Sequence, residues 1–179
     1  MLQAYLRLLS RRPLITQMVS AGVIGCAGDG IAQFVVEKRS LKQYDLQRGI
    51  RFFLMPSCYV APILSRWFRV LEKIGGKGAI WKRLAVDQLC WSPCFGASII
   101  FVLGFMESLD AKKAFDHTKS MCVEVYFKSL QFWPFVQLIN LNLIPINFRV
   151  IFVQMAALIW NSYLSFRTQK PVDTDYFME

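Results

Sequence analysis

The stretch from Phe132 to Arg149 reads FWPFVQLINLNLIPINFR, and it combines apolar side chains with amides, two prolines and one arginine. Helical spacing places four of its residues on one face, namely Trp133, Gln137, Asn140 and Ile144. An amide surrounded by lipid has to be hydrogen-bonded, so this face is expected to look inward. There it would either hold helices together or line a polar path.

Four charge-poor segments, including the one that contains this stretch, approach the length of a membrane helix, which is about 20 mostly apolar residues. The sequence therefore predicts an all-α, polytopic integral membrane helix bundle, embedded through residues 13–36, 50–71, 88–107 and 129–166. Pro145 interrupts the last segment, so four spans, or four with an extra buried or re-entrant helix, both remain open. A soluble protein with unusually long core helices is the alternative.

The composition supports a membrane protein. The chain has 179 residues, enough for a single domain, and 55% of them are hydrophobic. Only 18% are charged, where about 25% is usual for soluble proteins. The net charge is +9, but the basic residues are spread over all the loops. We therefore expect contacts with the lipid bilayer and its anionic lipids, and no direct nucleic-acid binding.

The first twelve residues form an amphipathic basic segment, and residues 167–179 form a polar tail. Leu2, Tyr5 and Leu9 fall at helical spacing opposite Arg7 and Arg11. Such a segment is similar to a mitochondrial transit peptide. We favour an uncleaved helix that lies on the membrane surface before Pro13 opens the first span, because the segment runs into that span without a linker and is not rich in serine. Whether it is cleaved remains open.

The cysteines and the single histidine argue against a disulfide framework, a metal centre and an enzyme. Five cysteines is an odd number, and four of them lie inside predicted spans. Cys90 and Cys94 share a helix face, but no further ligands accompany them, and His117 lies in a charged loop. Because no nucleophile or acid–base pair is visible either, we expect no catalytic residue, no metal and no cofactor.

Two features of the first span are informative. Gly22, Cys26 and Gly30 recur every fourth residue, which predicts a face that another helix can approach closely. Asp29 and Gln33 lie one turn apart, and an ionisable group inside a span normally has a partner. The candidate donors are the arginines at the two ends of the second span, which are Arg48, Arg51, Arg66 and Arg69. A structural ion pair and a pore-lining role both remain open for Asp29.

Asp87 and Gln88 come at the start of the third predicted span, shortly before Pro93. An aspartate at the start of a helix complements the partial positive charge there. The sequence therefore favours a helix cap for Asp87 over a role inside the membrane.

These residues together resemble the signature of the Mpv-seventeen/peroxisomal membrane protein family of small four-span organelle proteins. The core of the match is Trp133-Pro134, Gln137, Asn140, Pro145 and Arg149, followed by Trp160-Asn161. Supporting matches are Tyr5, Pro13, Gly28-Asp29 with Gln33, Arg48 with Arg51, Pro62 with Trp67, Asp87-Gln88 and Pro93. The chain departs from the family pattern at Leu141, where Phe is usual, and at Ala61, where Gly precedes the proline.

The resemblance implies a channel-like protein of the mitochondrial inner membrane that permits or modulates the passage of small solutes or ions. It also implies roles in membrane potential, reactive-oxygen metabolism and mitochondrial DNA maintenance, and a homo-oligomer is compatible with it. A peroxisomal membrane pore and a non-transporting scaffold or assembly factor are the alternatives. The segments Trp160 to Ser165 and Pro93 to Phe95 look more like the mitochondrial branch.

Two sets of site residues follow from the residue patterns and the resemblance. The predicted intramembrane polar or pore-lining network comprises Asp29, Gln33, Arg48, Arg51, Asp87, Gln88, Gln137, Asn140, Arg149 and Asn161. The predicted structural positions are Gly22, Gly28, Gly30, Pro62, Trp67, Pro93, Trp133, Pro134, Pro145 and Trp160.

Overall fold

The computed structural model describes residues 2–76 and 78–168, with the backbone alone at positions 2, 36 and 161–168. Within these ranges the chain forms helices and turns but no strand. The all-α prediction is therefore confirmed for the described residues.

The helices join into a few long rods. α1 (Leu2–Arg11) is followed by α2 (Pro13–Ile31), which continues as the π-helical segment η1 (Ala32–Val36), and a short 3-10 turn follows at η2 (Leu41–Gln43). The second rod comprises α3 (Leu46–Leu54), η3 (Met55–Val60) and α4 (Ala61–Glu72). The third comprises α5 (Ala79–Ala85), η4 (Val86–Trp91) and α6 (Ser92–Ser108). α7 (Ala111–Ser129), α8 (Trp133–Leu143) and α9 (Arg149–Thr168) complete the fold.

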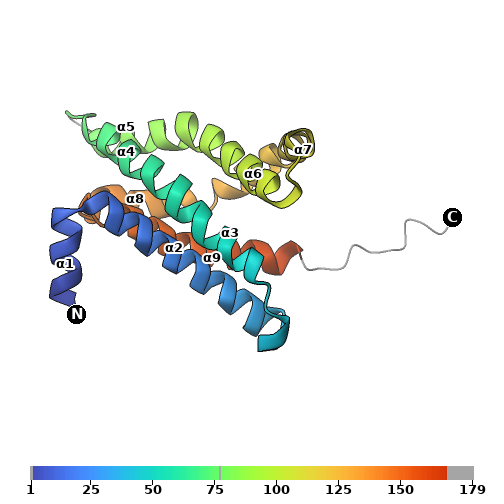
Figure 1. Cartoon of the computed structure of the whole chain (residues 1–179). Coiled ribbons are helices and arrows are strands. Elements are labelled where there is room, and N and C mark those ends of the chain that lie inside the picture. Colours follow the sequence, from blue (N-terminus) through green and yellow to red (C-terminus); the bar gives the residue numbers. More distant parts are fainter. Residues whose placement is uncertain (1, 77, 169–179) are drawn as a thin grey trace.

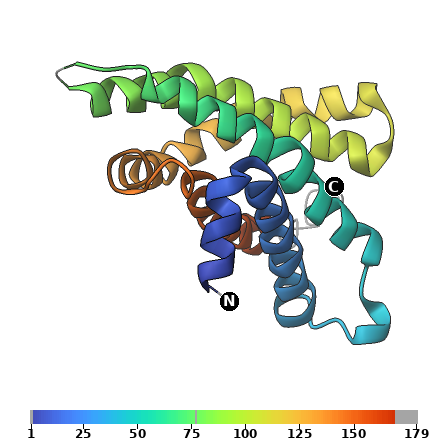
Figure 2. The same cartoon turned by 60° about the vertical axis from the view of Figure 1, so that its left-hand side comes forward.

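The rods run back and forth between two ends of the molecule (Figure 1). The first end holds α1, the start of α2, the end of α4, the start of α5 and the α8–α9 turn. The second end holds η1, the start of α3 and the α6–α7 turn. α7 folds back along α6, whereas α9 packs against α2 and α4 (Figure 2).

Prolines account for two of the π-helical segments. Pro62 and Pro93 have no N–H to donate, and their rings crowd the carbonyl four residues earlier. Those carbonyls belong to Cys58 and Leu89, which lie inside η3 and η4. The helix therefore widens locally and continues without a break. π-helical turns of this kind are frequent at functional sites.

Within the described residues, two helices are long and apolar enough to cross a membrane by length and composition, Pro13–Val35 and Ala79–Ser108. The second of these contains the predicted third segment and begins at Ala79, nine residues before Gln88. Asp87 therefore lies inside a continuous helix, and the prediction that it caps a helix is wrong. The predicted segment 129–166 is divided into α8 and α9, with Pro145 in the turn between them.

Glycines in α2 allow close packing, but only in part as predicted. A β-carbon at Gly22 would touch the ring of Phe53, and one at Gly28 would clash with Leu158 of α9. At Gly30 no atom of the described residues lies within 4 Å of such a β-carbon, so the predicted contact through Gly30 is wrong for the described part of the chain. The tightest backbone approach is instead at Gly25, where a β-carbon would clash with the carbonyl oxygen of Phe52.

We expect Gly25→Ala to lower the free energy of unfolding by about 1–3 kcal/mol, because the α2 and α3 backbones would have to separate. Gly30→Ala is the matched control and is expected to be neutral or slightly stabilising, since alanine favours helix and has open space there. Denaturant unfolding of the protein in bicelles, followed by tryptophan fluorescence, compares the two. Equal stability of the two variants would show that the α2–α3 approach does not depend on Gly25.

Candidate functional site

Buried and half-buried polar side chains form three clusters along the bundle. The Arg149 cluster lies at the first end and consists of Arg149, Glu72 and Arg83. The Asp29 cluster lies at the second end and consists of Asp29, Gln33, Glu37, Asp45 and Arg48. The Asp87 cluster lies between them and consists of Trp67, Asp87, Gln88, Gln137 and Asn140.

The Asp87 cluster joins α4, η4 and α8 through one carboxylate. The indole Nε1 of Trp67 donates to Asp87 Oδ1 at 2.7 Å, and the amides of Gln88 and Gln137 both donate to Oδ2 at 2.8 Å. Asn140 in turn donates to Gln137 Oε1 at 2.8 Å. Asp87 is 2% exposed and Asn140 is completely buried. The structure therefore places four predicted network residues together, and it adds Trp67, which was predicted only as a structural position.

Aromatic rings cover the Asp87 cluster. Trp67 stacks on Trp91 with ring centroids 4.2 Å apart, and Trp91 stacks on Phe95 at 5.2 Å. At the start of α8, Trp133 meets Trp160 of α9 edge to face, with ring centroids 6.3 Å apart. Trp67, Trp133 and Trp160, which were predicted as structural positions, thus all take part in aromatic contacts.

Several buried polar atoms in and beside the Asp87 cluster have no hydrogen-bond partner among the described residues. They are Gln88 Oε1, Asn140 Oδ1 and Trp91 Nε1, and Gln154 Nε2 of α9 is in the same state. Burial of an unpartnered polar group costs about 1–3 kcal/mol each. The interior at this level is thus polar and incompletely satisfied.

No Lys or Arg of residues 2–76 and 78–160 forms an ion pair with Asp87. Arg83 lies one helical turn before Asp87, but its guanidinium binds Glu72 and the Ile74 carbonyl. Arg149 binds Glu72 as well. The Asp87 carboxylate is therefore held by neutral donors alone.

The Asp29 cluster, in contrast, is charge-compensated. Gln33 Nε2 donates to Asp29 Oδ2 at 2.7 Å, so the two residues share a face as predicted. Arg48 Nε lies 2.7 Å from Asp29 Oδ1, and Arg48 also donates to Glu37 at 2.6 Å. Arg48 is thus the partner among the four candidate arginines. The contacts tie η1 and the following loop to the start of α3.

The loop around the Asp29 cluster carries one shifted titratable group. Tyr44 stacks on Phe34 with centroids 5.4 Å apart. Burial raises the pKa of Tyr44, and its contacts with Cys26 and the negative charge of Asp29 raise it further.

On α7, away from the three clusters, the hydrogen bond and charge of Lys128 lower the pKa of Glu124.

The Arg149 cluster ties the turn after α8 to α4. Arg149 donates to the carbonyls of Leu141 at 3.2 Å and Ile144 at 2.9 Å, and it pairs with Glu72. It thereby satisfies carbonyls at the C-terminal end of α8, which Pro145 leaves without helical partners. Close by, Gln17 of α2 donates to the Asn147 carbonyl at 2.8 Å.

The structure does not bring all the predicted network residues together. Arg51 lies outside the three clusters, and the side chain of Asn161 lies outside the described residues. Glu72, Glu37 and Gln17 were not predicted. Gln17 could have been noticed as an amide inside the first apolar segment, whereas Glu72 stood in a charged connection where nothing marked it.

A pocket of about 210 Å³ lies between α6 and α7, at the second end. Its lining is Gly104, Glu107, Ser108, Lys113, Ala114 and His117. None of these residues belongs to the three clusters. This pocket therefore does not reach the clustered polar residues.

Comparisons with known proteins agree with the residue pattern. The model of the Mpv17 / PMP22 family matches residues 104–165. The mitochondrial inner membrane protein Mpv17 of Caenorhabditis elegans is 44% identical over 93% of this chain and 92% of its own length. The proteins of the same name from Xenopus laevis and Homo sapiens are 31% and 30% identical, each over 94% of this chain and 97% of its own length. No solved structure matches.

The relatives cover nearly all of the chain, and they share one name, which states one location. This agrees with the apolar helices Pro13–Val35 and Ala79–Ser108. The chain therefore belongs to the Mpv17 / PMP22 family and is a protein of the mitochondrial inner membrane.

Proposed function

We propose that this protein permits or modulates the passage of small solutes or ions across the inner membrane, without catalysing a reaction. The observation that carries the proposal is the Asp87 cluster, because it places an uncompensated carboxylate and unpartnered amide atoms inside the bundle. Polar groups are costly at membrane depth and typically mark an ion or proton path when they occur there. The buried set is thus better suited to a polar route than to a purely apolar core.

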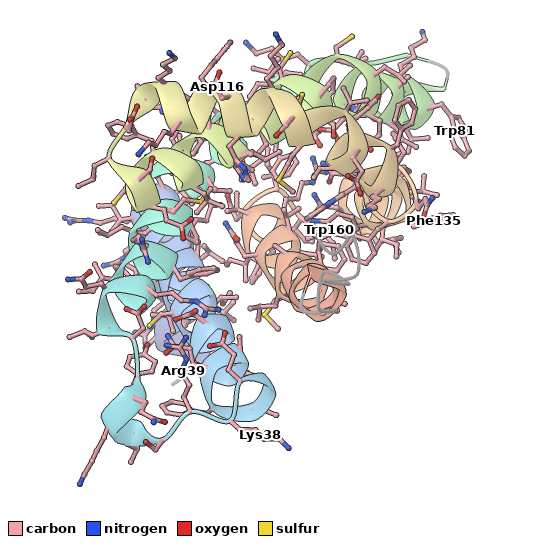
Figure 3. All side chains as sticks on the ribbon, turned by 90° about the vertical axis from the view of Figure 1, so that its right-hand side faces the viewer. Lys38, Arg39, Trp81, Asp116, Phe135 and Trp160 are labelled. Atoms are coloured by element: carbon pink, nitrogen blue, oxygen red, sulfur yellow. The ribbon has the colours of Figure 1, made fainter. Side chains whose placement is uncertain are left out.

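The proposed membrane arrangement follows from the three rods and α9. In it, the rods α2–η1, α3–η3–α4 and α5–η4–α6 each cross the bilayer, and α8 with α9 provides the last embedded segment. Large apolar side chains point outward from this bundle, including Trp81 of α5 and Phe135 of α8, which are 63% and 69% exposed (Figure 3). Such exposure suits contact with lipid.

The Asp29 and Arg149 clusters have a different role in this proposal. Both contain ion pairs that join separate helices at the ends of the bundle. We assign them to holding the rods together, so the polar route rests on Asp87, Gln137 and Asn140. Passage would then require the rods to separate around α8 or several chains to assemble.

Conductance of the purified protein in planar bilayers tests the proposal. We expect conductance above that of empty bilayers, and we expect Gln137→Leu to change it several-fold, because this variant removes both a donor to Asp87 and the acceptor of Asn140. Asn142→Leu is the matched control, since Asn142 lies on the same helix but is exposed. No conductance, or equal conductance in both variants and the wild type, would argue against the channel.

A non-transporting scaffold is the second candidate, and α7 favours it. This helix packs along α6 and yet exposes both charged residues and large apolar ones, with Phe115 60% and Phe127 63% exposed. A surface of this kind suits a protein partner or a second copy of the chain. Cross-linking from α7 and the native mass separate the two candidates, because a monomer that conducts argues against a scaffold.

The family roles in membrane potential, reactive-oxygen metabolism and mitochondrial DNA maintenance belong to this proposal as consequences of passage. Cells that lack the chain would lose mitochondrial DNA, and the wild type and Asn142→Leu would restore its copy number. If Gln137→Leu restored the copy number equally well while failing to conduct, these roles would not depend on passage.

A further inference from the structure

We propose that the Asp87 carboxyl group is a proton-binding site within the membrane domain, and that the side-chain amide of Gln88 flips when the proton binds. The inference goes beyond the proposed passage of solutes, because a site can bind a proton in a protein that does not conduct. It rests on the hydrogen-bond pattern around Oδ2 of Asp87 and on the unpartnered oxygen of Gln88.

The present contacts are those of an ionised carboxylate. Both oxygens of Asp87 accept, Oδ1 from Trp67 and Oδ2 from Gln88 and Gln137. An ionised carboxylate is an acceptor only, so three N–H donors suit it. Its charge, however, lies in a helix long and apolar enough to span a membrane. Proton binding removes this charge.

The charged and titratable groups on the surrounding elements do not compensate Asp87. α8 has no ionisable side chain. On α4, Arg66 and Arg69 are exposed. Glu72, also on α4, is paired with Arg83 and Arg149. On α5, Lys82 is exposed. On α7, Tyr126 donates its hydroxyl to the Gln88 carbonyl, and Glu124 pairs with Lys128. Asp29, the other fully buried aspartate, differs because Arg48 neutralises it.

The two amides at Oδ2 are not equivalent. Gln137 is fixed in its orientation, because its Oε1 accepts from Asn140 while its Nε2 donates to Asp87. Gln88 donates through Nε2 alone, and its Oε1 is buried without a partner. When a proton from water binds Oδ2, rotation of the Gln88 amide by about half a turn exchanges Nε2 for Oε1. The O–H of Asp87 then donates to Gln88 Oε1, and no charge is left.

A metal ion fits the site less well than a proton. Ca²⁺ and Mg²⁺ take about six or more oxygen ligands at short distance. Here three N–H groups already occupy the carboxylate, and they would repel a cation. The unpartnered oxygens in the cluster are Gln88 Oε1 and Asn140 Oδ1, which are too few for such a ligand shell, and Gln88 is the one bonded directly to Asp87.

Infrared difference spectroscopy on the full chain in lipid vesicles tests the proposal as pH is varied. We expect the carbonyl stretch of a buried carboxylic acid to appear reversibly on acidification and to shift in heavy water. It should be absent in Asp87→Asn and retained in the control Asp116→Asn, whose side chain lies on the outer face of α7 (Figure 3). Asparagine resembles the protonated acid, with one acceptor and one donor group, so Asp87→Asn is expected to fold.

Gln88 is tested in the same spectra. A glutamine side-chain carbonyl band should move in the same pH step, and this movement should vanish in Gln88→Leu while the carboxylic-acid band persists. If Asp87→Asn does not fold, Asp87→Glu serves instead, because the acid band should move to the frequency of glutamic acid.

Three results would overturn the proposal: no pH-dependent acid band, a band unchanged in the Asp87 variants, or a band that follows the sodium or calcium concentration at constant pH. Because none of these readouts requires conductance, a protein that shows the band without conducting would refute the channel and keep the proton site.

Discussion

Replacement of Arg48 by methionine is expected to lower the free energy of unfolding by about 3–5 kcal/mol, the range for removing one partner of a buried ion pair. The Asp29 side chain has no solvent exposure, so its charge would remain in the bundle with Gln33 as its remaining donor. The substitution would also remove the ion pair between Arg48 and Glu37, the second acidic partner of Arg48. Denaturant unfolding in bicelles measures the loss.

Arg51→Met is the matched control for this change. Arg51 lies three residues further along α3, and it has no ion pair or side-chain hydrogen bond within the described part of the chain. Its replacement is expected to change stability by about 0.5 kcal/mol or less. The double variant Asp29→Asn with Arg48→Met should recover much of the loss, because no buried charge is left unpaired. If the double variant were as unstable as the sum of the single ones, the pair would not be coupled.

The contact between Asp29 and Gln33 could be predicted from sequence because it is local. Two residues four apart on a helix share a face whatever the rest of the fold does. The sequence could limit the partner of Asp29 to four arginines but could not select Arg48 among them, because that choice depends on the path of the loop before α3. That loop is set by Asp45, whose backbone N–H donates to Gln33 Oε1 at 2.7 Å.

Asp87 shows why the same reasoning failed elsewhere. Lys82 and Arg83 made the residues before it resemble a loop, and Pro93 made the following residues resemble a helix start. In the structure the helix begins at Ala79, and the chain accommodates Pro93 by widening at η4. The charges do not interrupt the helix, since Lys82 is exposed and Arg83 finds Glu72 on α4. These are tertiary contacts, which periodicity does not reveal.

Glycine spacing was similarly insufficient to identify the helix contact. The regular four-residue repeat selected Gly30, but α2 rotates its tighter face, with Gly25, toward Phe52. Which side of a glycine-rich helix is used depends on how its partner helix crosses it, and a repeat in one helix does not contain that information.

Arg149→Gln is expected to cost about 3 kcal/mol, the second-largest effect among the variants considered. The lost groups are a charge pair with Glu72 and two charge-assisted hydrogen bonds to the carbonyls of Leu141 and Ile144. The cost is lower than for Arg48 because the Glu72 side chain is 37% exposed and keeps Arg83. Water can therefore stabilise the carboxylate that remains.

Arg149→Gln should also destabilise the C-terminal end of α8 more than the rest of the protein, and hydrogen exchange can measure this difference. Leu141 follows Asn140 in α8, so loosening the end of this helix should expose the Asp87 cluster to exchange before the whole protein unfolds. Hydrogen exchange of the α8 amides should rise in Arg149→Gln and stay unchanged in Arg66→Gln, whose side chain is exposed on α4. If α8 exchanged no faster while global stability fell, Arg149 would support the α4–α9 packing alone. Faster exchange confined to α8 would instead show that a single guanidinium, placed after Pro145, keeps the Asp87 cluster closed at the first end of the bundle.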